Sequence, residues 1–70
     1  MDEAFEPGAV MEWRDAHGLP RRGIVSRVVA GRVYLRCRQV NRRGRRVERE
    51  VEVWFDPNEV DRLRRVQHHH

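Results

Sequence analysis

With 70 residues the chain is too short for two hydrophobic cores, so we predict one domain over residues 1–67 and interpret His68 to His70 as the remnant of a purification tag. No run of hydrophobic residues approaches the roughly 20 that cross a bilayer, and no secretory signal is apparent. The single cysteine excludes an intramolecular disulfide and a CxxC zinc site. These features indicate a cytoplasmic protein that contacts no membrane. The net charge of +4 favours nucleic acid or an acidic protein surface as the partner.

The first part of the chain predicts two strands separated by a loop. Ala9 to Trp13 indicates a first strand. A loop of about nine residues, from Arg14 to Arg22, follows, because a glycine and a proline interrupt it and no periodicity is present. The β-branched residues between Gly23 and Ala30 favour a second strand, and Ala30-Gly31 provides a tight turn into a third.

Two strictly alternating segments, Arg32 to Gln39 and Val47 to Phe55, predict the third and fourth strands. Between them, Arg42 to Gly44 can form a three-residue loop with the glycine in the left-handed conformation. If Asn41 faces Arg45, apolar residues meet apolar residues and most opposite charges meet. This register predicts the pairs Arg38 with Glu48, Arg36 with Glu50, Tyr34 with Glu52, Arg32 with Trp54, Leu35 with Val51 and Val33 with Val53.

The segment Asp56-Pro57-Asn58-Glu59 has the residues of a helix start, with an aspartate that can cap and a glutamate that can complete a capping box. Only one helical turn fits before Val60 to Val66, which predicts a short fifth strand. The fold class is therefore all-β. Four strands, one helical turn and a last short strand are the order of a small five-stranded SH3-like or Tudor-like barrel.

Several short motifs resemble one known family, the RNA-polymerase-interacting domain of CarD-type transcription factors. The motifs are Phe5-Glu6-Pro7-Gly8, Val10, Trp13, His17-Gly18, Gly23-Ile24-Val25, Tyr34-Leu35-Arg36 and Leu63-Arg64-Arg65-Val66. The resemblance implies an SH3-like fold and RNA polymerase as a partner. The sequence departs from the family pattern because His17 comes one residue late, Arg14 replaces a usual proline, and the second, helical domain of the family has no counterpart. KOW domains and the Tudor tails of some helicases share the same opening.

Arginine is the basic residue throughout, since all fifteen basic residues are arginine and none is lysine. Arginine suits bidentate contact with phosphate or carboxylate, although a GC-rich genome produces the same bias. The tip of the predicted hairpin has the densest cluster and is the first candidate site for a partner, with Arg42, Arg43, Arg45 and Arg46. Basic residues from two other segments can extend this surface, namely Arg21 and Arg22 on the predicted loop and Arg62, Arg64 and Arg65 near the end.

The solvent-facing side of the predicted hairpin allows two interpretations. Arg32, Tyr34, Arg36 and Arg38 form a row that can follow a phosphate backbone, but the glutamates of the fourth strand are its predicted neighbours, which favours an ordinary face of ion pairs. Trp13 and Phe55 are expected in the core. Trp54 is expected to point outward, where it stacks on Arg32 or anchors an interface.

No arrangement of residues predicts catalysis, because His17 has no nucleophile or carboxylate placed near it and Cys37 lies on an apolar face. We therefore expect a monomeric, non-catalytic binding module that needs no cofactor. The first hypothesis is an adaptor of transcription or nucleic acid that docks on RNA polymerase or on nucleic acid through a sheet edge, Trp54 and the arginine tip. The alternative is a protein-interaction module or accessory subunit with no role in nucleic-acid binding.

Overall fold

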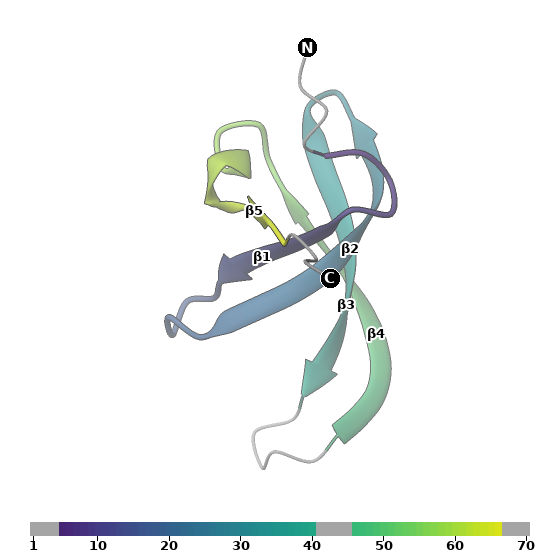
Figure 1. Cartoon of the computed structure of the whole chain (residues 1–70), viewed down its shortest axis with the longest axis vertical. Helices are drawn as coiled ribbons and strands as arrows, with labels where there is room; N and C mark the ends of the chain where they lie inside the picture. Colours follow the sequence, from purple (N-terminus) through teal and green to yellow (C-terminus); the bar gives the residue numbers. More distant parts are fainter. Residues whose placement is uncertain (1–4, 41–45, 67–70) are drawn as a thin grey trace.

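The computed structural model describes residues 5–40 and 46–66, which form one antiparallel sheet with the strand order β4-β3-β2-β1-β5 (Figure 1). The strands are β1 (Val10–Arg14), β2 (Pro20–Val29), β3 (Arg32–Val40), β4 (Arg46–Phe55) and β5 (Arg64–Arg65). A single 3-10 turn, η1 (Val60–Arg62), precedes β5. The predicted all-β class and order of elements are confirmed. Among the described strands β4 and β5 lie at opposite edges of the sheet, so the predicted closure into a barrel is not confirmed.

The connection between β1 and β2 is a tight hairpin, and the predicted nine-residue loop is wrong. Arg14 already pairs with Pro20, so five residues make the turn. The Asp15 Oδ1 atom accepts hydrogen bonds from the backbone N–H groups of His17 at 2.9 Å and Leu19 at 3.0 Å. The Asp15 carboxylate thus supplies the acceptor for backbone N–H groups that strand pairing would otherwise satisfy, and it closes the turn. Pro20 is tolerated because it stands at the first position of a strand.

The turn between β2 and β3 is confirmed at Ala30-Gly31, where φ is 51° and 81°. Positive φ at both central residues of a two-residue hairpin defines a type I′ turn, whose twist matches that of the strands. Further along, Ser26 is an extra residue in β2, because Val25 faces Leu35 but Arg27 faces Tyr34. This bulge moves Arg27 from the face that simple alternation predicts to the opposite face.

The register of β3 and β4 agrees with the prediction near the tip and differs from it further along. Val40 faces Arg46, as expected if Asn41 faces Arg45, although residues 41–45 lie outside the described part of the chain. An irregularity between Arg38 and Val40 then moves the register by two residues. Because two is the period of a strand, every residue keeps its face while its partner changes. The observed pairs are Arg38 with Glu50, Cys37 with Val51, Arg36 with Glu52, Leu35 with Val53, Tyr34 with Trp54 and Val33 with Phe55.

The segment after β4 turns as predicted, but Asp56 does not cap it with its side chain. The Glu59 backbone N–H donates to the Asp56 carbonyl at 2.7 Å, and Glu59 Oε1 accepts the Asp56 backbone N–H at 3.4 Å. The Asp56 carboxylate instead accepts a hydrogen bond from Arg32 Nε at 2.8 Å. The predicted fifth strand is shortened to Arg64–Arg65 because residues 60–62 form the 3-10 turn.

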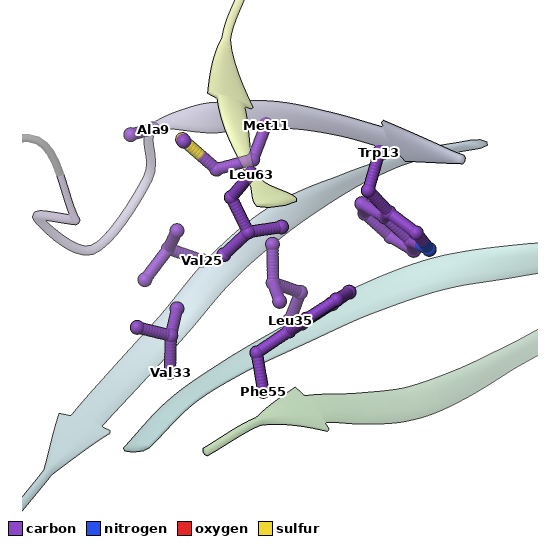
Figure 2. Packing of buried hydrophobic residues seen from close by; sticks show 8 residues of the cluster. All are labelled: Ala9, Met11, Trp13, Val25, Val33, Leu35, Phe55 and Leu63. Carbon is purple, nitrogen blue, oxygen red and sulfur yellow. The ribbon is translucent and has the colours of Figure 1, made fainter. Parts of the chain in front are cut away.

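The core lies on the concave side of the curled sheet (Figure 2). Its buried residues are Ala9, Met11, Trp13, Val25, Val33, Leu35, Phe55 and Leu63. The rings of Trp13 in β1 and Phe55 in β4 meet edge to face, with centroids 5.4 Å apart. Since β2 and β3 separate these strands in the sheet, this contact requires the sheet to curl around its core. The prediction that both rings are buried is confirmed.

Candidate macromolecule-binding surface

The convex side of the sheet, here called the outer face, carries the side chains that alternate with the core residues. On β3 these include Tyr34, Arg36 and Arg38, whose neighbours Val33 and Leu35 are buried. Figure 1 shows that β3 and β4 extend beyond the other strands, so part of this face belongs to a two-stranded ribbon. The predicted outward row of β3 is therefore present, and its ion pairs decide whether it can bind a partner.

Two arginines of this row have no acidic partner in the described part of the chain. Arg36 and Arg38 face Glu52 and Glu50 across the strands, yet no described carboxylate lies within 4.0 Å of either guanidinium. Glu52 instead approaches Arg27, at 3.7 Å. Among the described side chains, the expected ion pair of Arg36 with a β4 glutamate does not form, while the Glu48 side chain expected beside Arg38 lies outside them.

Arg32, at the start of the row, is already engaged. Its Nε atom donates to Asp56 Oδ1 at 2.8 Å, and Nη1 lies 3.5 Å from the Tyr34 hydroxyl. The Tyr34 hydroxyl and the Asp56 carboxylate both raise the pKa of the Arg32 guanidinium above its ordinary value. The prediction that Arg32 stacks on Trp54 is wrong, since Trp54 faces Tyr34 in the register. This arginine fixes the end of β4 to the start of β3.

Arg21 and Arg22 lie in β2 and not on a loop, and strand alternation separates them. Arg21 Nε donates to Asp15 Oδ2 at 3.0 Å on the core side, where it faces Trp13. Arg22 Nε donates to Glu12 Oε2 at 3.1 Å on the outer face. Of the two, Arg22 is therefore the one that lies on the outer face.

The three arginines near the end of the chain also separate. The Arg62 guanidinium lies 5.6 Å from the centroid of the Phe55 ring, and Arg65 lies 3.7 Å from a Glu6 carboxylate oxygen. Arg64 faces Glu12 in the sheet and lines, with Arg22, a surface hollow of about 410 Å³. Arg65 lines the same hollow, but it faces the buried Met11 in the sheet, so strand alternation places Arg64 on the outer face beside Arg22.

A second hollow connects these residues with the row on β3. It has a volume of about 400 Å³, and Arg22, Arg36, Arg38 and Glu50 line it together with the apolar side chains of Val10 and Ile24. The hollow forms where β2 and β3 separate, since their pairing ends at Ile24 and Arg36. Arg22 lines both hollows. We call Arg22, Arg36, Arg38 and Arg64 the outer arginine surface.

Trp54 points outward as predicted, with 55% of its surface exposed. The Tyr34 ring lies beside it, with centroids 6.3 Å apart and planes at 42°. The Arg27 guanidinium covers the Tyr34 ring at 4.2 Å. Sequence reasoning missed Arg27, because only the bulge at Ser26 brings it to this face. Since Trp13 and Phe55 lie on the other face, the four rings do not converge into an aromatic cage.

The arginine tip predicted as the first candidate site lies mostly outside the described residues. Arg42, Arg43 and Arg45 belong to the segment 41–45, and Arg46 opens β4 opposite Val40. Their role stays a prediction from the sequence.

Cys37 is the free thiol of β3 and is half-buried on the core side, as expected. Burial raises the pKa of this thiol, and the nearby Arg21 guanidinium opposes the effect. Within residues 5–40 and 46–66, no three histidine, cysteine, aspartate or glutamate side chains come together as a metal site. The same ranges contain no helix that is long and apolar enough to span a membrane.

Comparison with known proteins found no matching protein-family model, no matching curated protein and no matching solved structure. The resemblance to the CarD-type domain therefore stays a prediction.

Proposed function

We propose that this chain is a non-catalytic module that binds nucleic acid through the outer arginine surface. The observation that carries the proposal is the exposed pair Arg36 and Arg38, which follow one another on the outer face of β3 without a carboxylate partner among the described residues. Arginines in stable ion pairs with carboxylates are poor phosphate ligands, whereas the guanidinium groups of these two meet no carboxylate among the described side chains.

The spacing of the surface suits a chain of phosphates. Side chains on one face of a strand repeat every 6.6 to 7 Å or so, which places Arg36 and Arg38 at successive steps along β3. Arg22 and Arg64 continue the positive charge across β2 and β5 through the two hollows that Arg22 shares. Glu12 neutralises part of this charge at Arg22, so Arg36 and Arg38 are the residues expected to contribute most to binding.

We further propose that the sheet belongs to the SH3-like type, closed into a small barrel. Four strands in meander order, one 3-10 turn and a short last strand paired with β1 support this proposal. The edge-to-face contact of Trp13 with Phe55 supports it as well, because it draws β1 and β4 together across the core.

Fluorescence anisotropy with a labelled oligonucleotide tests the proposed binding. Arg36→Ala is compared with Arg49→Ala, which removes the same charge from an exposed position of β4 that alternates with Glu50. At about 50 and 200 mM salt, the wild type is expected to bind with a steep salt dependence, and Arg36→Ala is expected to reduce the slope of log K against log salt by about one phosphate contact. Equal effects of the two variants would contradict a specific role for the outer arginine surface.

A second candidate function is docking on a protein, for which the resemblance suggests RNA polymerase. The long edge of β4 favours this candidate, since β4 has ten residues and pairs on one side only among the described strands. An extended segment of a partner can add to such an edge. Binding to purified RNA polymerase that resists salt and is lost in Trp54→Ala, together with no binding to oligonucleotides, would favour this candidate over the first.

A further inference from the structure

One row of the outer face joins three neighbouring strands with aromatic and planar side chains. Arg27 of β2 faces Tyr34 of β3, which faces Trp54 of β4. The guanidinium lies 4.2 Å from the centroid of the tyrosine ring, and the tryptophan ring lies 6.3 Å from it. We call these three residues the aromatic row.

The aromatic row contributes little to the core, because Trp54 is 55% exposed and lies on the side opposite Phe55. Tyr34 does not stack flat on it, since the two planes meet at 42°. More than half of the Trp54 surface is therefore exposed to solvent. Arg27 lies over the Tyr34 ring and 3.7 Å from a Glu52 carboxylate oxygen, so its guanidinium contacts two side chains of this face.

The row stands directly beside Arg36 and Arg38, for which the described side chains provide no carboxylate partner. Tyr34, Arg36 and Arg38 are successive outward residues of β3, each about one step of 6.6 to 7 Å from the next. Since Trp54 faces Tyr34, a ligand that stacks on Trp54 has the guanidinium donors of Arg36 and Arg38 one and two such steps away. The ligand that combines planar rings with negative charges at a regular short spacing is a nucleic acid.

We propose that this face binds single-stranded nucleic acid, with a base stacked on Trp54 and the adjoining phosphates bound by Arg36 and Arg38. This inference rests on the proposed function and specifies its substrate. In a duplex each base is covered by its neighbours, so an exposed indole has no base face to meet. An unpaired strand offers both its base faces and its phosphates, which is the combination that the aromatic row and the outer arginine surface can hold together.

Three labelled probes test the inference by fluorescence anisotropy: a 12-nucleotide single strand, a 12-mer of the same backbone with abasic sites, and a 12-base-pair duplex. Trp54→Ala is expected to weaken binding of the single strand by roughly 5- to 140-fold and to leave the abasic and duplex probes unchanged. Trp54→Phe retains a ring and is expected to restore most of the affinity. Leu19→Ala is the control, because Leu19 is 56% exposed at the β1–β2 turn, away from the row.

The outcomes separate the inference from the function on which it rests. If Arg36→Ala weakens all three probes while Trp54→Ala weakens none, or weakens all equally, nucleic-acid binding stands and stacking is overturned. If the wild type binds none of the probes at about 50 mM salt, the proposed function fails and this inference fails with it.

Discussion

Among the described glycines, Gly23 is the one at which a side chain would have the least room. A Cβ atom there would lie 3.0 Å from the Arg36 carbonyl oxygen, 3.1 Å from Trp13 Cη2 and 3.3 Å from Leu35 Cβ. The missing side chain is what lets the indole pack over β2. We expect Gly23→Ala to lower the free energy of unfolding by about 1 to 3 kcal/mol, measured by urea denaturation. Gly18→Asn is the control, because a Cβ atom at Gly18 would have no heavy atom within 4 Å and asparagine tolerates its φ of 78°; an equal loss in both variants would contradict the packing argument.

Asp15 makes the free energy of unfolding depend on pH in the acid range. Its pKa is lowered, first because its carboxylate accepts the backbone N–H of Leu19 and then because Arg21 and His17 also donate to it, while burial opposes the shift. A carboxyl with a lowered pKa in the folded state stabilises the fold above its unfolded pKa of about 3.9. That contribution is lost as the pH falls through the folded-state pKa.

We therefore expect Asp15→Asn to be less stable than wild type at pH 7, and the difference to shrink below about pH 4. Urea denaturation at several pH values measures it. Asp61→Asn serves as the comparison, because Asp61 is exposed in η1 and makes no ion pair within the described residues. A difference that stays constant down to pH 2 or so would mean that the carboxylate charge has no part in the turn.

At the scale of elements, some features were predictable from single residues and others were not. The Ala30-Gly31 turn and the alternation of β3 follow from local rules, and both are confirmed. The tight turn at Asp15 was missed, because a side chain supplies the acceptor that strand pairing otherwise provides. The bulge at Ser26 was also missed, since nothing in its neighbours signals an extra residue. The composition of the outer face depends on that bulge, which brings Arg27 beside Tyr34.

The β2–β3 turn carries a strain that a substitution can relieve. Ala30 has a φ of 51°, a conformation that costs alanine about 1 to 2 kcal/mol and asparagine less. We expect Ala30→Asn to raise the free energy of unfolding by about 0.5 to 1 kcal/mol, and Ala30→Val to lower it, because a β-branched side chain tolerates positive φ least. Urea denaturation followed by tryptophan fluorescence decides; a loss of stability in Ala30→Asn would argue against the type I′ geometry.

At the scale of the whole molecule, stability and binding occupy opposite sides of one curled sheet. The neighbouring residues Trp54 and Phe55 lie on these two sides, with 55% and 6% of their surfaces exposed. Phe55→Ala is expected to cost about 3 to 5 kcal/mol, a large part of the roughly 4 to 10 kcal/mol available to a domain of this size. Trp54→Ala is expected to cost less than about 1 kcal/mol. Thermal unfolding of both variants checks this contrast, and similar losses would place both rings in the core.

The two tryptophans also provide the most direct test of the central claim, that the outer face binds nucleic acid. In a ¹H–¹⁵N correlation spectrum each indole N–H gives its own signal, one from the core side at Trp13 and one from the outer face at Trp54. On titration with a 12-nucleotide single strand, the Trp54 indole and the Arg36 and Arg38 Nε signals are expected to shift while the Trp13 indole stays in place. Shifts confined to Trp13 and its neighbours, or no shifts at all, would contradict the claim.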